Sequence, residues 1–339
     1  MKKYLSRRSI TIFLVLLLVV LSFCLVPRIN QIRTILSLTK VDDYPLYYMK
    51  YYGSYHMNYD INNPEPGNDR AQTSHYTNDF SMKCSSFLAR NENGDPIFCR
   101  NLDYDLLSHP ITVLHTNPPG KNASLVTADL FYLGYSYSNP PTNSIFNNQR
   151  LLDAPRITID GMNEYGLSLA ILSVPYAKPT LDPNKLTTDE VGANRILLDH
   201  AKTVEEAIEE LNKINIKFHN SAAHFMIADA GGNSAVVEFI KGEMKVVRNE
   251  KSWQVCTNFV LSEDIYGKVG KDRYDLAEKV LQEKNGVLSE EEAMDLLSKV
   301  SQSGTMWSVI YNLKTGDTSI AMGRKFDQIN EFHLDMKEE

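Results

Sequence analysis

Cysteine is scarce in this chain: there are four in 339 residues, and Cys24 stands inside an apolar run near the N-terminus. The three cysteines beyond that run cannot all pair with one another, so no disulfide framework holds the fold and at least one thiol is free. A bond between Cys99 and Cys256 stays open. Thiols outside the reducing cytosol tend to be oxidised to disulfides. A free thiol in an exported protein therefore suggests a functional role.

Other features are also absent. The formal charge is -7 and no run of Lys or Arg follows the first residues of the chain, which excludes the charge pattern of a nucleic-acid-binding protein. No spacing of His indicates a metal site. The chain has no Cys-Trp signature and no downstream His-Asn pair, so a papain-type peptidase is disfavoured. We therefore expect no nucleic-acid partner, no metal and no cofactor. The composition, 43% hydrophobic and 23% charged, is that of a globular protein with a sizeable core.

The longest apolar run is segment 10–26, ITIFLVLLLVVLSFCLV, which follows four basic residues and precedes Pro27-Arg28. This pattern is typical of a signal peptide or a signal anchor, which we assign to residues 1–26. Its 17 residues are marginal for a membrane span, and no small-x-small cleavage site follows. We favour an uncleaved anchor with its basic end inside and the rest of the chain outside the cytoplasm, in a bacterial cell envelope. Secretion after cleavage is the alternative.

The remaining chain divides into two regions. Residues 27–83 are rich in Tyr, Asn and Asp without a sustained period, which indicates an irregular linker or pro-segment. Strand-like patterns begin at Cys84, and two helical stretches follow, 187–214 and 271–302, each with a Ser/Thr-x-x-Glu capping pattern. Two groups of antiparallel strands with pairs of helices predict an α+β architecture, with sheets in the middle and helices outside.

The segment 84–105, CSSFLARNENGDPIFCRNLDYD, predicts two strands joined by an Asn93-Gly94 turn. The start of the first strand of such a hairpin lies opposite the end of the second, so Cys84 should meet Arg100 and Asp103. A cysteine becomes a good nucleophile when it is a thiolate, and nearby cations favour that form. Without further signals, a buried cysteine beside a surface ion pair explains the pattern as well.

This hairpin is similar to the N-terminal segment of the choloylglycine hydrolase family, the linear-amide C–N hydrolases that include bile salt hydrolases, penicillin V acylases and acid ceramidase. In that family the nucleophilic cysteine is followed 16 positions later by Arg and 19 positions later by Asp, as Cys84 is by Arg100 and Asp103. The resemblance extends over most of residues 84–339, through the segments IDGMNEYGLSLAILSVP, HFMIADAGGNSAVVEF, QVCTNF, DRYDLA and TMWSVIYNL. It implies an N-terminal-nucleophile fold, an αββα sandwich of antiparallel sheets.

The resemblance also implies the roles of individual residues. Cys84 becomes the first residue of the active chain, its thiol attacks the amide carbonyl and its α-amine acts as the base. Arg100 favours the thiolate, and Asp103 binds the α-ammonium. Asn258 matches the family's oxyanion donor. Arg273 matches the late Arg that completes the charge network.

Two further residues carry weaker expectations for the oxyanion or the substrate. Where bile salt hydrolases have Asn in Leu-Asn-x-Pro, this chain has Ser173, whose hydroxyl or backbone N–H would have to substitute. Asn163 stays near the site by resemblance, although it also fits a turn. His224 begins a strand beside an apolar run, which favours a packed structural histidine over a metal ligand.

The expected function is an exported cysteine amidase that hydrolyses a non-peptide linear N-acyl amide. Because 83 residues precede Cys84, we expect cleavage between Lys83 and Cys84, by self-cleavage or by a protease that recognises Lys83. An acyltransferase that uses the same thioester, or a non-catalytic membrane-anchored homologue, is the alternative. The sequence leaves the acyl group, the amine and homo-oligomerisation open.

Overall fold

The fold is built on two β-sheets that pack face to face. The computed structural model describes residues 25–55, 83–104, 109–146, 148–218, 222–264 and 267–337. The larger sheet has nine strands in the order β1-β2-β5-β6-β7-β8-β11-β12-β13, and every neighbouring pair is antiparallel except β2 and β5. Its strands are β1 Thr39–Asp42, β2 Leu46–Tyr51, β5 Ile111–Thr116, β6 Ser124–Asp129, β7 Thr158–Asn163, β8 Ser168–Ser173, β11 Ala223–Ala228, β12 Ser234–Ile240 and β13 Glu243–Arg248.

The second sheet has six strands, all antiparallel, in the order β14-β3-β4-β15-β16-β17. Two short strands, β9 and β10, form a separate parallel pair. The bounds are β3 Lys83–Arg90, β4 Pro96–Asp103, β14 Gln254–Cys256, β15 Thr305–Asn312, β16 Asp317–Met322, β17 Ile329–His333, β9 Leu186–Thr188 and β10 Ile214–Ile216, with 3-10 helices η2 Leu130–Leu133 and η3 Gln149–Ile157.

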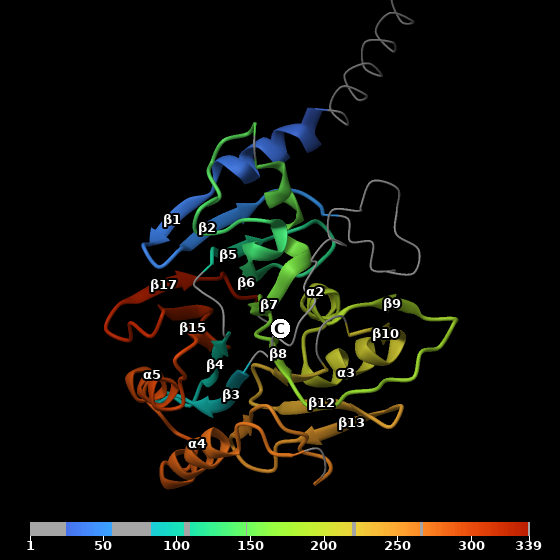
Figure 1. Ribbon diagram of the computed structural model, residues 1–339, viewed down its shortest axis with the longest axis vertical. Coiled ribbons are helices and arrows are strands. Elements are labelled where there is room, and N and C mark those ends of the chain that lie inside the picture. The colour runs from blue at the N-terminus through green and yellow to red at the C-terminus, as the bar shows by residue number, and fades with distance from the viewer. Residues whose placement is uncertain are drawn as a thin grey trace, which may run out of the picture.

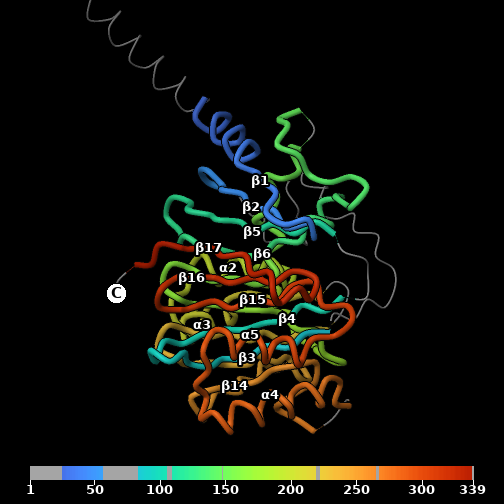
Figure 2. The backbone as a smooth tube through the Cα atoms, turned by 90° about the vertical axis from the view of Figure 1, so that its left-hand side faces the viewer, coloured from blue at the N-terminus to red at the C-terminus, as the bar shows by residue number. Residues whose placement is uncertain are grey.

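Helices cover the outer face of each sheet. Helices α2 (Glu190–His200) and α3 (Val204–Lys213) lie on the larger sheet, and α4 (Lys271–Glu283) and α5 (Glu290–Lys299) lie on the smaller one (Figure 1). The predicted capping residues begin α3 and α5, because Thr203 accepts from the Glu206 N–H and Ser289 accepts from the Glu292 N–H. The predicted α+β class and its αββα layers are therefore confirmed (Figure 1), and Figure 2 looks along the stack of layers from the side of α5.

The hairpin of β3 and β4 confirms the predicted turn. Gly94 adopts a φ of 86°, a left-handed conformation that favours glycine, and its N–H donates to the Asn91 carbonyl at 2.9 Å. In the resulting register Cys84 lies opposite Leu102, and Ser86 lies opposite Arg100. The start of β3 and the end of β4 therefore meet, as the spacing predicts.

The prediction of an irregular segment over residues 27–83 is wrong for residues 27–51. A helix covers residues 25–36, and β1 and β2 follow it as an edge of the larger sheet. Strand β2 pairs with β5 along its whole length and buries Leu46 and Met49 completely. Aromatic side chains such as Tyr47, Tyr48 and Tyr51 suit a half-buried strand. The Asn- and Asp-rich stretch that suggested a loop, residues 56–82, lies outside the described residues.

The predicted signal segment lies outside the described residues except for Leu25 and Val26. Within the described ranges, no helix is both long and apolar enough to cross a bilayer.

Candidate active site

Cys84 lies at the start of β3, on the face of the smaller sheet that packs against the larger one, and it is fully buried. Lys83 precedes it as the first residue of β3 and lies opposite Asp103. The backbone N–H of Cys84 donates to Asn258 Oδ1 at 2.8 Å. The geometry is that of the chain before any cut, and the predicted cleavage bond joins the first two residues of β3, the partly buried Lys83 and the buried Cys84.

Arg100 lies beside this thiol. Its Nη2 is 3.5 Å from Cys84 Sγ and also donates to the Ile171 carbonyl of the facing sheet at 2.8 Å. Burial raises the pKa of the Cys84 thiol, and the positive charge of Arg100 offsets part of that increase. The structure brings the two residues together, but in the uncut chain burial dominates and keeps the thiol protonated.

Asp160 holds Arg100 in place, and sequence reasoning did not single it out. This β7 carboxylate is fully buried, and its Oδ2 lies 3.0 Å from Arg100 Nη1. It also accepts hydrogen bonds from Thr127 Oγ1, Trp307 Nε1 and Tyr311 OH. Because these donors come from both sheets, Asp160 fixes the guanidinium between the layers. The signal in the sequence was a single acidic residue in the apolar stretch RITIDG.

Asn258 and Arg273 hold the backbone around the nucleophile. Arg273 Nη1 donates to the Cys84 carbonyl at 2.6 Å and to Ser85 Oγ at 2.7 Å, while Nη2 donates to Asn258 Oδ1 at 2.8 Å. Asn258 Nδ2 donates to the Ser173 carbonyl at 2.8 Å. In the uncut chain these side chains clamp both sides of Cys84. The predicted oxyanion role of Asn258 stays a prediction.

Asp103 lies at the end of β4, close to Arg273. Its Oδ1 accepts from Thr305 Oγ1 at 2.5 Å, and its Oδ2 is 3.7 Å from Arg273 Nη1 without a hydrogen bond to any residue in the described ranges. Burial raises the pKa of Asp103 to about 6. The uncut chain has no α-ammonium at residue 84, so the predicted contact with that group stays a prediction.

The two residues with weaker expectations differ in their placement. Ser173 ends β8 and reaches the cluster through its carbonyl. Asn163 does not join it: its Nδ2 donates to the carbonyls of Leu198 and Ala201, and its Oδ1 accepts from two N–H groups of the following turn. We therefore interpret Asn163 as a turn residue that fastens the end of α2.

The other cysteines and His224 have structural environments. Cys99 and Cys256 are both free and buried, in separate cores, so the disulfide that the sequence left open is not formed. His224 is packed, as predicted, with Nε2 2.8 Å from the Thr257 carbonyl and Nδ1 3.2 Å from Glu238 Oε1. This contact fastens the backbone directly before Asn258.

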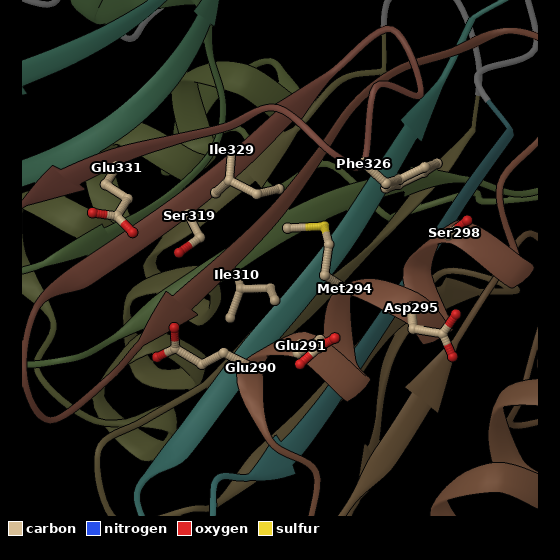
Figure 3. Close-up of a pocket in the computed structure, with 10 residues that line it drawn as sticks. All are labelled: Glu290, Glu291, Met294, Asp295, Ser298, Ile310, Ser319, Phe326, Ile329 and Glu331. Carbon is tan, nitrogen blue, oxygen red and sulfur yellow. The ribbon is translucent and has the colours of Figure 1, made fainter.

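A pocket of about 390 Å³ opens elsewhere, on the outer side of the smaller sheet (Figure 3). Helix α5 supplies Met294 and several acidic side chains, and the strands supply Ile310 and Ile329 (Figure 3). None of the residues clustered around Cys84 lines it. In the uncut chain the nucleophile is thus buried away from this pocket.

Comparisons with known proteins find a sequence family and solved structures of similar fold. The sequence model of the family described as "Acyl-coenzyme A:6-aminopenicillanic acid acyl-transferase" matches residues 89–326, a range that holds Arg100, Asp103, Asn258 and Arg273 and begins after Cys84. Penicillin V acylase from Agrobacterium tumefaciens is a similar solved structure, with a TM-score of 0.50 and 19% identity over 75% of this chain and 86% of that chain.

Two structures of conjugated bile acid hydrolase from Clostridium perfringens are also similar. Both are 18% identical over 75% of this chain, with TM-scores of 0.51 and 0.53 and coverage of 93% and 94% of the matched chains. At this identity the likeness shows the fold. No curated protein matches the chain significantly.

Proposed function

The chain belongs to the acyl-coenzyme A:6-aminopenicillanic acid acyl-transferase family, and from this premise we propose that it is a cysteine enzyme that cleaves a linear N-acyl amide. The match agrees with the N-terminal-nucleophile family that the sequence motifs indicated, whose enzymes include amide hydrolases and acyltransferases. The observation that carries the proposal is the placement of Arg100, 3.5 Å from the Cys84 thiol and anchored on Asp160. We further propose an extracytoplasmic, membrane-anchored location, supported by the basic and apolar residues 1–26.

The proposed activation is cleavage of the bond between Lys83 and Cys84. The Cys84 thiol adds to the Lys83 carbonyl, the C–N bond breaks, and the Cys84 nitrogen takes up the proton, which leaves a thioester. That step already frees the α-amine of Cys84; water then hydrolyses the thioester, which frees the Cys84 thiol and leaves Lys83 with a terminal carboxylate. Arg273 and Asn258 support this step because they hold the Cys84 carbonyl and N–H while the bond is attacked.

The proposed turnover uses the same thiol. The α-amine of Cys84 takes the thiol proton, and the thiolate attacks the amide carbonyl of the substrate. The amine product leaves with that proton, and the acyl group remains on sulfur. Water releases it as an acid in the hydrolase reading, whereas a second amine captures it in the acyltransferase reading.

The test of this proposal is an assay with two probe amides, penicillin V and a glycine-conjugated bile acid, on the cleaved protein. These probes correspond to the names of the similar enzymes, penicillin V acylase and conjugated bile acid hydrolase. Free acid as the sole acyl product indicates a hydrolase, and acylation of added 6-aminopenicillanic acid indicates an acyltransferase. A folded chain that stays uncut and forms no acyl-enzyme with either probe would overturn the proposal in favour of a non-catalytic homologue.

The N-terminal fragment is expected to stay bound after cleavage. Strand β2 pairs with β5, and Tyr55 OH donates to the buried Asp199 at 2.6 Å. We expect fragments 1–83 and 84–339 to co-elute in native size-exclusion chromatography and to separate only in denaturant. Tyr55→Phe should lower the denaturant needed, because a hydrogen bond to a charged group contributes about 1.5–3 kcal/mol. Elution of 84–339 alone under native conditions would contradict this expectation.

The rate of self-cleavage should fall as the pH drops through about 6, where Asp103 becomes protonated in the uncut chain. An ionised Asp103 stabilises the ammonium that emerges at Cys84, and the protonated acid does not. After cleavage that ammonium lowers the pKa of Asp103. The rate of amide turnover should therefore begin to fall at a lower pH than the rate of self-cleavage does. Rates measured across pH by intact mass and by product release check both limbs.

Asp103→Asn is the control for this pH dependence, because it keeps the shape and removes the titration. Its self-cleavage should be slow and show no inflection near pH 6. An unchanged rate inflection in Asp103→Asn would assign the inflection to another group.

The raised pKa of Asp103 also affects the stability of the uncut chain. Burial raises the folded pKa above the ordinary value of 3.8, so the folded chain binds more protons between these values. Asp103 therefore makes the uncut chain less stable as the pH rises from about 4 to about 6.

A further inference from the structure

An apolar stripe runs along the exposed side of the helix at residues 25–36. Leu25, Ile29, Ile32 and Leu36 follow one another at intervals of four, three and four residues and are 51%, 51%, 42% and 55% exposed. Residues at this spacing lie on one side of a helix. Other side chains of the same helix are buried, among them Thr34 at 0%. The helix therefore packs with one side and presents leucine and isoleucine on the other.

Arginines border this stripe on both sides. In a helix of 3.6 residues per turn, Arg28 lies on one flank of the stripe and Arg33 on the other. Both are exposed, and the Arg33 guanidinium lies 4.0 Å from the centre of the Tyr52 ring. An apolar strip between cations is the pattern of a helix that lies in the headgroup region of a membrane.

A second copy of this helix fits the stripe less well than a membrane does. The four-three-four spacing would allow helix pairing, and the arginines would then occupy the flanking positions that select a partner. A paired copy brings arginine to arginine in either orientation, because both flanks carry the same charge. Anionic headgroups instead complement both flanks, so the charges favour a lipid surface.

The preceding chain points to the same occupant. Residues 10–24 are apolar and lead directly into Leu25. The segment between η2 and η3 lies at the same end of the molecule (Figure 1 and Figure 2) and carries Tyr137 and Phe146, which are 75% and 84% exposed.

We propose that the helix at residues 25–36 docks on an anionic membrane surface, with its apolar stripe in the boundary between headgroups and acyl chains. Strand β2 joins this helix to the larger sheet. Docking would therefore hold the enzyme at the membrane after a cut before Cys84, a consequence that rests on the proposed function. The docking itself is independent of cleavage.

The experiment uses the full chain in the Cys84→Ala background, which is inactive in the proposed reaction, so its outcome does not depend on activity. Cys24→Ser removes the thiol of the predicted signal segment. Cys99 and Cys256 are buried, which protects them from the label. An environment-sensitive fluorophore is attached at Ile32→Cys and, as the matched control, at the exposed neighbour Gln31→Cys. Each protein is reconstituted into vesicles of phosphatidylcholine and phosphatidylglycerol that contain lipids spin-labelled near the headgroup.

We expect quenching to be several-fold stronger at position 32 than at position 31. Vesicles of phosphatidylcholine alone, or the change of Arg28 and Arg33 to Gln, should weaken quenching at position 32 while the protein still sediments with the vesicles. Equal or absent quenching at the two positions would overturn the proposal. Quenching that is insensitive to lipid charge would overturn the choice of an anionic surface. Disulfide formation between unlabelled copies of the Ile32→Cys variant would assign the stripe to a second copy.

Discussion

Replacing Cys84 with alanine is expected to leave the chain in one piece and to abolish amide turnover. Denaturing intact-mass measurement of the wild type should show fragments 1–83 and 84–339, whereas Cys84→Ala should show only the full chain. The nucleophile of both proposed steps is the Cys84 thiol, and removal of a catalytic nucleophile lowers turnover by about 10⁴-fold or more. Arg100, which lies 3.5 Å from that sulfur, cannot substitute because a guanidinium is not nucleophilic at neutral pH.

The matched control is Cys99→Ala. Cys99 is also a fully buried thiol of the same hairpin, but it lies in the separate core beneath α4 and α5. This variant should cleave itself and turn over substrate as the wild type does. Two results would contradict the expectation in different ways. Cleavage of Cys84→Ala at the same bond would assign maturation to a separate protease, and turnover by Cys84→Ala would assign the reaction to another nucleophile.

The part of the site that lies within one hairpin could be predicted from the sequence. A tight turn fixes the register of two antiparallel strands, so the positions of Asn93 and Gly94 determine that Cys84 meets the Arg100–Asp103 stretch. The capping patterns at Thr203 and Ser289 located two helix starts for the same reason, because they depend on neighbours in sequence. Family resemblance, rather than local pattern, supplied Asn258 and Arg273.

The contacts between the two sheets could not be predicted in this way. Asp160 and Arg100 come from different sheets, and their pairing depends on how the layers stack. The same holds for β2, whose partner β5 lies beyond the hairpin in sequence. The shift of the Cys84 pKa also depends on burial in the finished core, which raises it although a cation lies beside the sulfur.

The ion pair of Asp160 and Arg100 is expected to give the largest stability change of any single charge in the site. Both side chains are 0% exposed, and their closest oxygen and nitrogen are 3.0 Å apart. Asp160→Asn leaves the Arg100 charge buried without its carboxylate, and breaking such a pair lowers the free energy of unfolding by about 3–5 kcal/mol. Chemical denaturation in the Cys84→Ala background, where every variant stays uncut, measures this loss. The double variant with Arg100→Met should lose less than the sum of the single changes, because each removes the same interaction.

A second buried pair separates stability from function. Asp199 Oδ1 lies 2.7 Å from Arg195 Nη2, and both side chains are 0% exposed, but neither contacts Cys84 among the described residues. Asp199→Asn should therefore lose comparable stability and still cleave itself at a temperature where it is folded. Asp160→Asn should be slow under the same conditions, because the freed guanidinium no longer holds its place at the thiol. Equal rates for the two variants would show that Asp160 supports the fold alone. An unfolding free energy of Asp160→Asn close to that of the parent chain would show that the buried pair is not what holds Arg100.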